Sequence, residues 1–412
     1  MSTLKKISNF SDTVNLFGDI FEGNETQLSI DHVEKTVLSA YHIQGREIKF
    51  IIPRTFGRYM VLNKLRFWFK LKYAVEKDYI KIYINPSFAF EKVEVALNSQ
   101  NVLSMYNQYH GRTHQIMKFL KYERDHRLYC SSERIYNYDD DSEKARMKFH
   151  DSKPIGTHYV DFCYSIDTSL FDLNKILLDN IEMEITFYVP SNLAARCFYI
   201  DQGEGGVTEN QVEFVKAFLT ADFVVPRDNL REYLIKGLER SPVPYDTYLI
   251  HSYRYPDQPV GNNNIENCYI NNRWPSYFIM CVIPKADENW DINVDTKWSN
   301  HSLVSNLQLN VKGINVPNRM IPVEDTTDFI GASLYYKYLK DAFPNNSFDF
   351  MKLINKMIYV YDLENSEYYD PEENVDVNIQ YTNIHTQNLN VYIIFLTKHQ
   401  ILIDNDRNVK VI

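Results

Sequence analysis

The sequence contains one succession of segments twice, and this repeat constrains the fold more than any other feature. Residues 93–102 and 307–316 each hold an alternating apolar strand, a polar turn and a second short apolar step. Each is followed by a polar stretch and then by an aromatic-rich segment with helical spacing, at 109–121 and 328–341. The copies lie roughly 200 residues apart, far more than one unit of a solenoid. The repeat predicts two related domains in tandem.

The later segments of the two halves correspond in the same order. Residues 159–167 match 357–363, and the strongly alternating residues 181–189 match 375–381. The second half adds an apolar run at 391–396. Strict alternation of apolar and polar residues is typical of antiparallel strands with one buried face.

The same alternation dominates the rest of the chain, for example at 65–72, 215–225 and 303–311. The 31 Tyr and 24 Phe, against 13 Gly, favour pleated surfaces. Helical patterns are few, and the clearest covers 228–239 with Asp228 as its expected N-cap. The regular alternation of strands and helices that an α/β fold needs is missing. We therefore expect an all-β protein of two tandem eight-stranded antiparallel jelly-roll sandwiches, a double jelly roll with short helical insertions.

The repeat also sets the expected domain limits. We expect a polar N-terminal arm at residues 1–28, a first jelly roll at 29–190 and a second at 191–412. Gly203–Gly206 lies near this junction and is interpreted as a flexible connection, because no Lys-Ser or Lys-Thr follows as in a P-loop. Residues 1–28 show no signal-peptide pattern, and no stretch approaches the length of a membrane span. These features predict synthesis in the cytoplasm.

Charge and cysteine content exclude several classes of protein. The net charge is −10, and no basic stripe is present, so we expect weak or no direct DNA binding. The number of cysteines is odd and no two are close in sequence, which fits neither a disulfide framework nor a zinc site. Buried free thiols are expected instead. The cysteines are Cys130, Cys163, Cys197, Cys268 and Cys281.

Two histidines give the strongest hint of a metal site. His110 and His114 have the i,i+4 spacing of a zinc metalloprotease helix, but Gly111 stands where that motif needs Glu. We therefore favour a structural role for both. Four glycosylation sequons occur, and without a signal peptide they are expected to stay unmodified. Their asparagines are Asn9, Asn24, Asn300 and Asn345.

Acidic residues gather at two places. Asp139–Asp141 is interpreted as an exposed acidic loop rather than a cation site. Asp404, Asp406 and Arg407 predict a local salt-bridged turn. No spacing singles out the paired carboxylates of a glycoside hydrolase, although a β-sandwich can carry such a pair. We predict no catalytic, cofactor-binding or metal-binding residue and no cofactor, with a two-domain glycan-binding protein or glycoside hydrolase as the alternative.

The order of segments resembles the major capsid protein of Polintons (Mavericks) and the related adintoviruses. Glu47–Pro53, followed by Tyr59 and the strand at 61–73, is similar to that family's opening strand pair. Phe90–Asn98 followed by Asn107–Arg112 is similar to its strand, turn and helix, although His110 and Gly111 depart from the usual Tyr-rich turn.

The second half continues the resemblance. Residues 216–239 are similar to the strand and helix that open the second jelly roll, and Asn306–Gly313 with Val316-Pro317 to its next signature. The most specific match is the C-terminal pair of segments, Val391–Phe395 and Ile401–Val409, an apolar strand followed by an acidic, Arg-Asn-Val tail. In all, the resemblance covers about residues 30–412 in consistent order.

The resemblance implies a structural protein of the virion and not an enzyme. Three chains would form a hexon-like homotrimer of pseudo-hexameric outline, and such capsomers would tile an icosahedral capsid. A separate single-jelly-roll penton protein would occupy the five-fold vertices. Whether a membrane lies inside the shell is not implied by these residues.

Overall fold

The structure is a computed structural model that describes most of the chain from residue 30 onward. The described residues are 30–75, 80–84, 88–106, 110–121, 152–153, 155–164, 166, 169–173, 175–200, 212–285, 303–324, 328–344 and 358–412. The expected arm at 1–28 therefore lies outside them. No helix among the described residues is long and apolar enough to cross a membrane.

Strands dominate both halves of the chain. In the first half they are β1 (Ile30–Ser39), β2 (His42–Gln44), β3 (Glu47–Ile52), β4 (Tyr59–Val61), β5 (Arg66–Val75), β6 (Ile80–Ile84), β7 (Lys92–Leu97), β8 (Gln100–Tyr106), β9 (Ser152–Lys153), β10 (Gly156–Tyr164), β11 (Ile176–Leu177), β12 (Met183–Tyr188), β13 (Phe198–Ile200) and β14 (Glu213–Pro226). In the second half they are β15 (Val243–Gln258), β16 (Gly261–Arg273), β17 (Tyr277–Pro284), β18 (Val304–Val311), β19 (Ile314–Val316), β20 (Ile358–Asp362), β21 (Asn374–Asn383), β22 (Leu389–Ile403) and β23 (Val409–Val411).

Helices are short insertions between strands. They are α3 (His110–Leu120), α6 (Ser169–Asp172), α7 (Leu193–Cys197), α8 (Asp228–Leu238) and α9 (Phe329–Ala342), with a 3-10 turn at Leu62–Lys64. The three helices expected from the sequence are thus present. Asp328 caps α9 by accepting hydrogen bonds from two backbone N–H groups. The expected cap of α8 is wrong by one residue, because Arg227 is the N-cap and Asp228 lies in the first turn.

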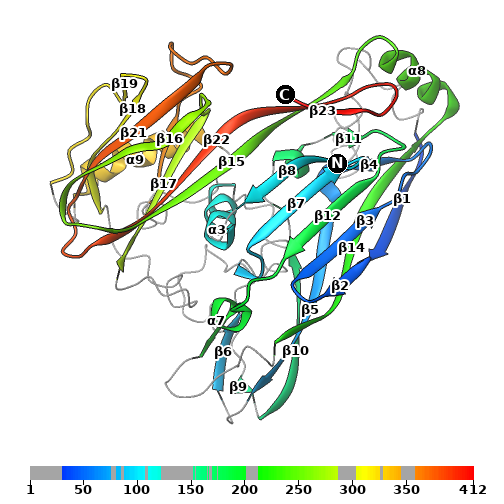
Figure 1. Cartoon of the computed structure of the whole chain (residues 1–412), viewed down its shortest axis with the longest axis horizontal. Helices are drawn as coiled ribbons and strands as arrows, with labels where there is room; N and C mark the ends of the chain where they lie inside the picture. The colour runs from blue at the N-terminus through cyan, green and yellow to red at the C-terminus, as the bar shows by residue number, and fades with distance from the viewer. Residues whose placement is uncertain are drawn as a thin grey trace, which may run out of the picture.

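Each half forms a sandwich of two antiparallel sheets with the same strand order (Figure 1). The first sandwich pairs a sheet with the core order β1-β14-β5-β10 with a sheet of core order β3-β12-β7-β8. The short strands β4 and β11 extend the first of these sheets beside β14, and β2 extends the second beside β3. The second sandwich pairs β15-β22-β17-β20 with β16-β21-β18-β19. The core strands of these four sheets can be counted from one to eight within each jelly roll, from β1 to β14 in the first and from β15 to β22 in the second. In both jelly rolls, the first sheet then has the strand order first, eighth, third, sixth, and the second sheet has the order second, seventh, fourth, fifth. This is the jelly-roll topology, so the expected double jelly roll is confirmed.

The strand pairing corrects one part of the sequence interpretation. Residues 216–239 were expected to open the second jelly roll, but their strand, β14, pairs with β1 and β5 as the eighth strand of the first. Its inward side chains Ala217, Leu219 and Phe223 complete the first core. By pairing, the second jelly roll begins at β15 rather than at residue 191. The alternation of β14 shows which face is buried but not which sheet the strand joins.

Aromatic side chains fill the first core. Phe50, Phe67, Phe69, Phe90 and Phe187 contact one another mostly edge to face, with ring centroids 4.7–6.2 Å apart. The second core has a similar composition around Phe278, Tyr361 and Phe395. The four cysteines within the described residues are buried free thiols, as expected, whereas Cys130 lies outside them.

Candidate assembly surfaces

The residues that the sequence singled out for chemistry do not converge on one site. Asp139–Asp141, Gly203–Gly206 and all four sequon asparagines lie outside the described residues. Among the residues that the structure describes, no three His, Cys, Asp or Glu side chains are grouped as a metal site would need. His114 is buried and its ring stacks on Tyr164 with centroids 4.5 Å apart. The structural role expected for this histidine agrees with its packing inside the fold.

Helix α3 belongs to the first jelly roll by sequence and packs against both jelly rolls. It follows β8, and its buried apolar side chains include Ile116, Met117 and Leu120. They join a cluster on the outer face of the β15-β22-β17-β20 sheet. This cluster includes Ile279, Cys281, Val360, Tyr392, Ile394 and Leu396 from that sheet, and Leu339 of α9. The two sandwiches therefore share a continuous apolar seam, with α3 between them (Figure 1).

A buried ion pair lies between the two jelly rolls at the other end of this seam. Arg407 Nη2 lies 2.5 Å from Asp179 Oδ1, and its Nε donates to the Asp179 carbonyl oxygen at 2.8 Å. The Asp179 side chain is 4% exposed and that of Arg407 13%. Asn98 of the first jelly roll donates to the Arg407 carbonyl oxygen at 2.8 Å. Arg407 thus joins the two jelly rolls.

This contact corrects the expected salt-bridged turn at 404–407. The turn is closed by Asn408, whose backbone and side-chain nitrogens both donate to the Asp404 carboxylate. These hydrogen bonds, chiefly that of the Asn408 side chain, lower the pKa of Asp404. The turn is local as expected, but the ion pair of Arg407 is not, because its partner lies 228 residues away.

The start of β15 and the end of β22 enter the first core. Tyr245 is fully buried, donates to the Ile176 carbonyl oxygen at 3.0 Å and accepts from the Leu178 N–H at 3.2 Å. Burial raises the pKa of the Tyr245 hydroxyl. Ile401 and Ile403 of β22 lie in the same cluster. Because this core contains strands from both halves, the two jelly rolls are expected to move as one unit.

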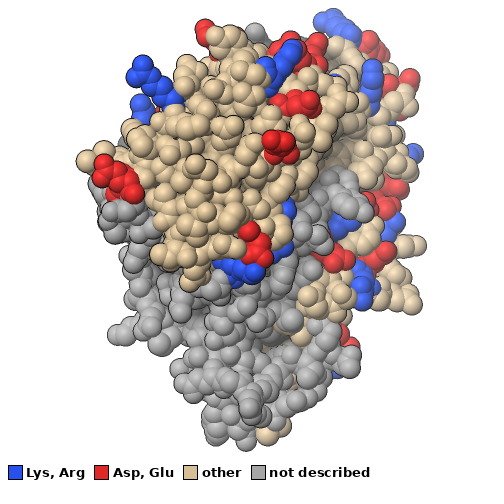
Figure 2. All heavy atoms as spheres, turned by 60° about the vertical axis from the view of Figure 1, so that its left-hand side comes forward, with Lys and Arg blue, Asp and Glu red and all other residues tan. Residues whose placement is uncertain are grey.

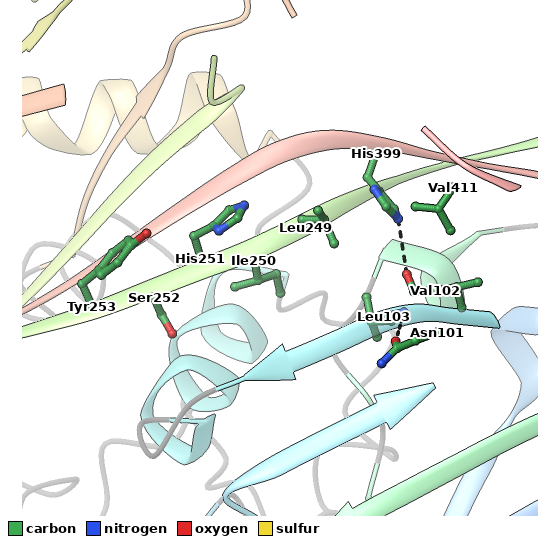
Figure 3. Close-up of a pocket in the computed structure, with 10 residues that line it drawn as sticks. All are labelled: Asn101, Val102, Leu103, Leu249, Ile250, His251, Ser252, Tyr253, His399 and Val411. Carbon is green, nitrogen blue, oxygen red and sulfur yellow. Dashed lines mark hydrogen bonds between the residues drawn. The ribbon is translucent and has the colours of Figure 1, made fainter. Parts of the chain in front are cut away.

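A shallow hollow of about 470 Å³ lies along the seam, where β8 passes β15 (Figure 3). Its ten lining residues include two histidines but no Asp, Glu, Lys or Arg. The His399 imidazole lies 3.3 Å from the Val102 carbonyl oxygen. Burial lowers the pKa of both His251 and His399. The hollow therefore lacks the pair of carboxylates that glycoside hydrolysis uses.

One large sheet face of the first jelly roll remains uncovered by the described residues. On the outer side of β1-β14-β5-β10, Trp68 stacks on Phe218 with ring centroids 6.0 Å apart. Lys216 lies over the Phe218 ring, and Lys70 lies over Tyr159. We call this surface the lysine-aromatic face; it consists of Val37, Trp68, Lys70, Tyr159, Lys216 and Phe218.

The second jelly roll presents a different surface, which comes forward in Figure 2 and carries few charged side chains there. On the outer side of β16-β21-β18, amide and hydroxyl side chains bond across the strands. Thr382 Oγ1 lies 2.8 Å from Asn262 Oδ1 and 3.4 Å from Asn306 Nδ2, and Asn378 accepts from the Asn267 N–H. Amide and hydroxyl side chains of this kind suit protein–protein contacts that retain bridging water molecules.

Comparisons with known proteins place the fold. No protein-family model matches the sequence, and no curated protein matches it. Solved structures do match. A cryo-EM structure of the Sputnik virophage is 11% identical, with TM-score 0.62 over 93% of this chain and 89% of that chain.

Two further structures match over almost the whole of both chains. A quasi-atomic model of the PBCV-1 virus capsid is 10% identical, with TM-score 0.59 over 96% of this chain and 98% of that chain. The Faustovirus major capsid protein is 8% identical, with TM-score 0.56 over 98% of each chain. At such low identity the likeness establishes the shared fold, two jelly rolls in one chain.

Proposed function

We propose that this chain is a major capsid protein, a structural subunit that forms pseudo-hexameric homotrimers and tiles an icosahedral viral shell. The observation that carries the proposal is the pair of jelly rolls with identical strand order, held together by a shared core and a buried ion pair. The likeness to virophage and capsid structures over nearly the full chain supports it. A flat facet needs hexagonal packing, and three chains with two sandwiches each supply six similar units.

We propose further that the chain belongs to the capsid proteins of the Polinton (Maverick) and adintovirus type. The support is the ordered resemblance of the sequence, above all the C-terminal strand and tail at 391–409. In a virion of that type, the partners would be neighbouring capsomers and a single-jelly-roll penton protein. The net charge of −10 favours weak or no direct contact with DNA.

The structures reported above give no support to a glycan-binding protein or glycoside hydrolase. The hollow on the seam lacks the two carboxylates that glycoside hydrolysis requires. A structural role without enzymatic activity is therefore the proposal that the chain's features favour.

Size-exclusion chromatography with light scattering tests the proposal. We expect a stable trimer whose interfaces each bury roughly 2,000 Å² or more, in the range of permanent assemblies. Negative-stain electron microscopy of the same sample should show pseudo-hexagonal particles or closed shells. A protein that stays monomeric at micromolar concentration would contradict the proposal.

A further inference from the structure

Another cavity, of about 300 Å³, opens on the seam between the two jelly rolls. Its floor is the outer face of the β15-β22-β17-β20 sheet, and its walls are the C-terminal ends of α3, α6 and α9. Its aromatic and aliphatic lining residues include Met117, Leu173, Tyr248, Tyr277, Phe343 and Leu396. Apolar pockets of this volume between two domains are common binding sites for small molecules.

Three aromatic rings are grouped in this cavity. The Tyr277 ring centroid lies 5.9 Å from that of Tyr248 at an interplanar angle of 69°, and 5.9 Å from that of Phe343 at 38°. All three side chains are half-buried, and all three line the cavity. The face of an aromatic ring attracts a cation, and groups of such rings hold quaternary ammonium ions in other proteins. The rings therefore favour a cation with apolar substituents over an anion.

The charged side chains at the rim of the cavity leave a net negative charge. Lys121 Nζ pairs with the Asp172 carboxylate, so these two charges offset each other. The Asp246 carboxylate accepts from the side-chain amide of Gln400 at 2.6 Å, and this partner is neutral. Among the described lining residues, Asp246 is thus the carboxylate that no lysine or arginine of the lining offsets. A cationic ligand would pair with it, although its exposure keeps this contribution modest.

The helices add partial negative charge. Both α3 and α9 end at the cavity, which Lys121 and Phe343 line directly after the last helical residue. The last carbonyl groups of a helix have no hydrogen-bond partner within it, and the C-terminus carries a partial negative charge. Asp362 lies opposite Tyr277 in the pairing of β17 with β20, and burial, followed by this carboxylate, raises the pKa of the Tyr277 hydroxyl. The cavity is therefore apolar in its walls and negative in its surroundings.

We infer that this cavity binds a small alkylammonium ion, with the methyl groups on its nitrogen against the rings of Tyr248, Tyr277 and Phe343 and its charge balanced by Asp246. The site uses both jelly rolls, because α3 and α6 belong to the first and the sheet and α9 to the second. A bound ion holds this junction together, and it stabilises the folded chain as its concentration rises above the dissociation constant. The inference concerns a single chain and does not depend on the proposed assembly.

Choline and its uncharged isostere 3,3-dimethylbutan-1-ol test the inference, because the two molecules share a shape and differ in charge. Each gives a single methyl signal in the NMR spectrum, and the broadening of this signal on titration with the full chain gives a dissociation constant. We expect choline to bind at least about tenfold more tightly than the alcohol, since the cation contacts more than one ring. Choline should also raise the melting temperature, whereas the alcohol at the same concentration should not.

Substitutions in the cavity separate the roles of the rings and the carboxylate. Tyr277→Leu keeps an apolar side chain but removes the central ring, and it should weaken choline binding about three- to tenfold, whereas Tyr277→Phe should bind choline as the unaltered chain does. Asp246→Asn should weaken binding about two- to threefold. The matched controls are Tyr233→Leu on α8 and Asp406→Asn in the exposed C-terminal turn, which should leave the affinity unchanged. Melting temperatures measured without ligand show whether each variant is folded.

A methylated ammonium group occurs both in free amines and in the headgroup of phosphatidylcholine. Choline binding without cosedimentation on phosphatidylcholine vesicles would assign the site to a free amine, and cosedimentation that Tyr277→Leu abolishes would assign it to the lipid headgroup. Equal affinities for choline and the alcohol, choline binding that is unchanged in folded Tyr277→Leu, or no binding of choline at millimolar concentrations would overturn the inference. None of these outcomes bears on the proposed trimer, which light scattering decides.

Discussion

Asp179 stabilises the junction between the jelly rolls through one carboxylate. Its oxygens accept from Arg407 and, at 2.9 Å, from the Gly57 N–H, and its side chain is almost fully buried. Asp179→Ala would leave the guanidinium and the Gly57 N–H without this partner. Removing one member of a buried pair costs about 3–5 kcal/mol, so thermal unfolding should shift to a markedly lower temperature. Asp406→Ala in the neighbouring exposed turn is the control and should change little; equal melting temperatures for both variants would contradict the assignment.

Two histidines, the buried His399 and the half-buried His251, make the seam sensitive to acid. Burial, with a smaller contribution from His399, lowers the pKa of His251, and burial also lowers that of His399. The unfolded chain then binds more protons than the folded one, so the free energy of unfolding should fall as pH drops below about 6.5. His251→Gln with His399→Gln should flatten this dependence between pH 7 and 5, as measured by chemical denaturation. His42→Gln serves as control, and an unchanged slope in the double variant would refute the explanation.

At the scale of elements, the position of α3 depends on one glycine. A Cβ added at Gly111 would come within 2.9 Å of the Phe88 Cα atom. Gly111→Ala should therefore push α3 away from the first jelly roll and disturb its packing on the second. We expect a loss of about 1–3 kcal/mol, measured by thermal denaturation. Gly237→Ala, in the partly exposed α8, should be neutral or stabilising; a similar loss in both variants would rule out the close contact as the cause.

Elements were predictable from the sequence where the signal is local. Alternation located β12, β21 and β22, and helical spacing located α3 and α9. The partner of a strand is not local information, which explains why β14 was assigned to the wrong jelly roll. Side-chain partners across the junction between the jelly rolls could not be predicted from the sequence either. The turn around Arg407 is visible in the sequence, but nothing near it points to Asp179.

At the scale of the whole molecule, the acidic net charge and the lysine-aromatic face have opposite effects on DNA binding. The net charge of −10 repels DNA, whereas Lys70 and Lys216 on one face could attract phosphate. Lys70 Nζ, however, lies 3.6 Å from Asp161 Oδ2, which offsets part of its charge. We therefore expect the trimer not to retard duplex DNA in a gel at about 150 mM salt.

A variant with Lys70→Gln and Lys216→Gln tests whether the lysine-aromatic face contacts DNA. DNA retardation that arises from this face should weaken steeply as salt rises and should be absent in the variant. Retardation by the unaltered trimer that survives these two substitutions would require another basic surface and would contradict the expectation of weak or no DNA binding. Retardation by the unaltered trimer that the substitutions abolish would locate the DNA contact on the lysine-aromatic face and would contradict the same expectation.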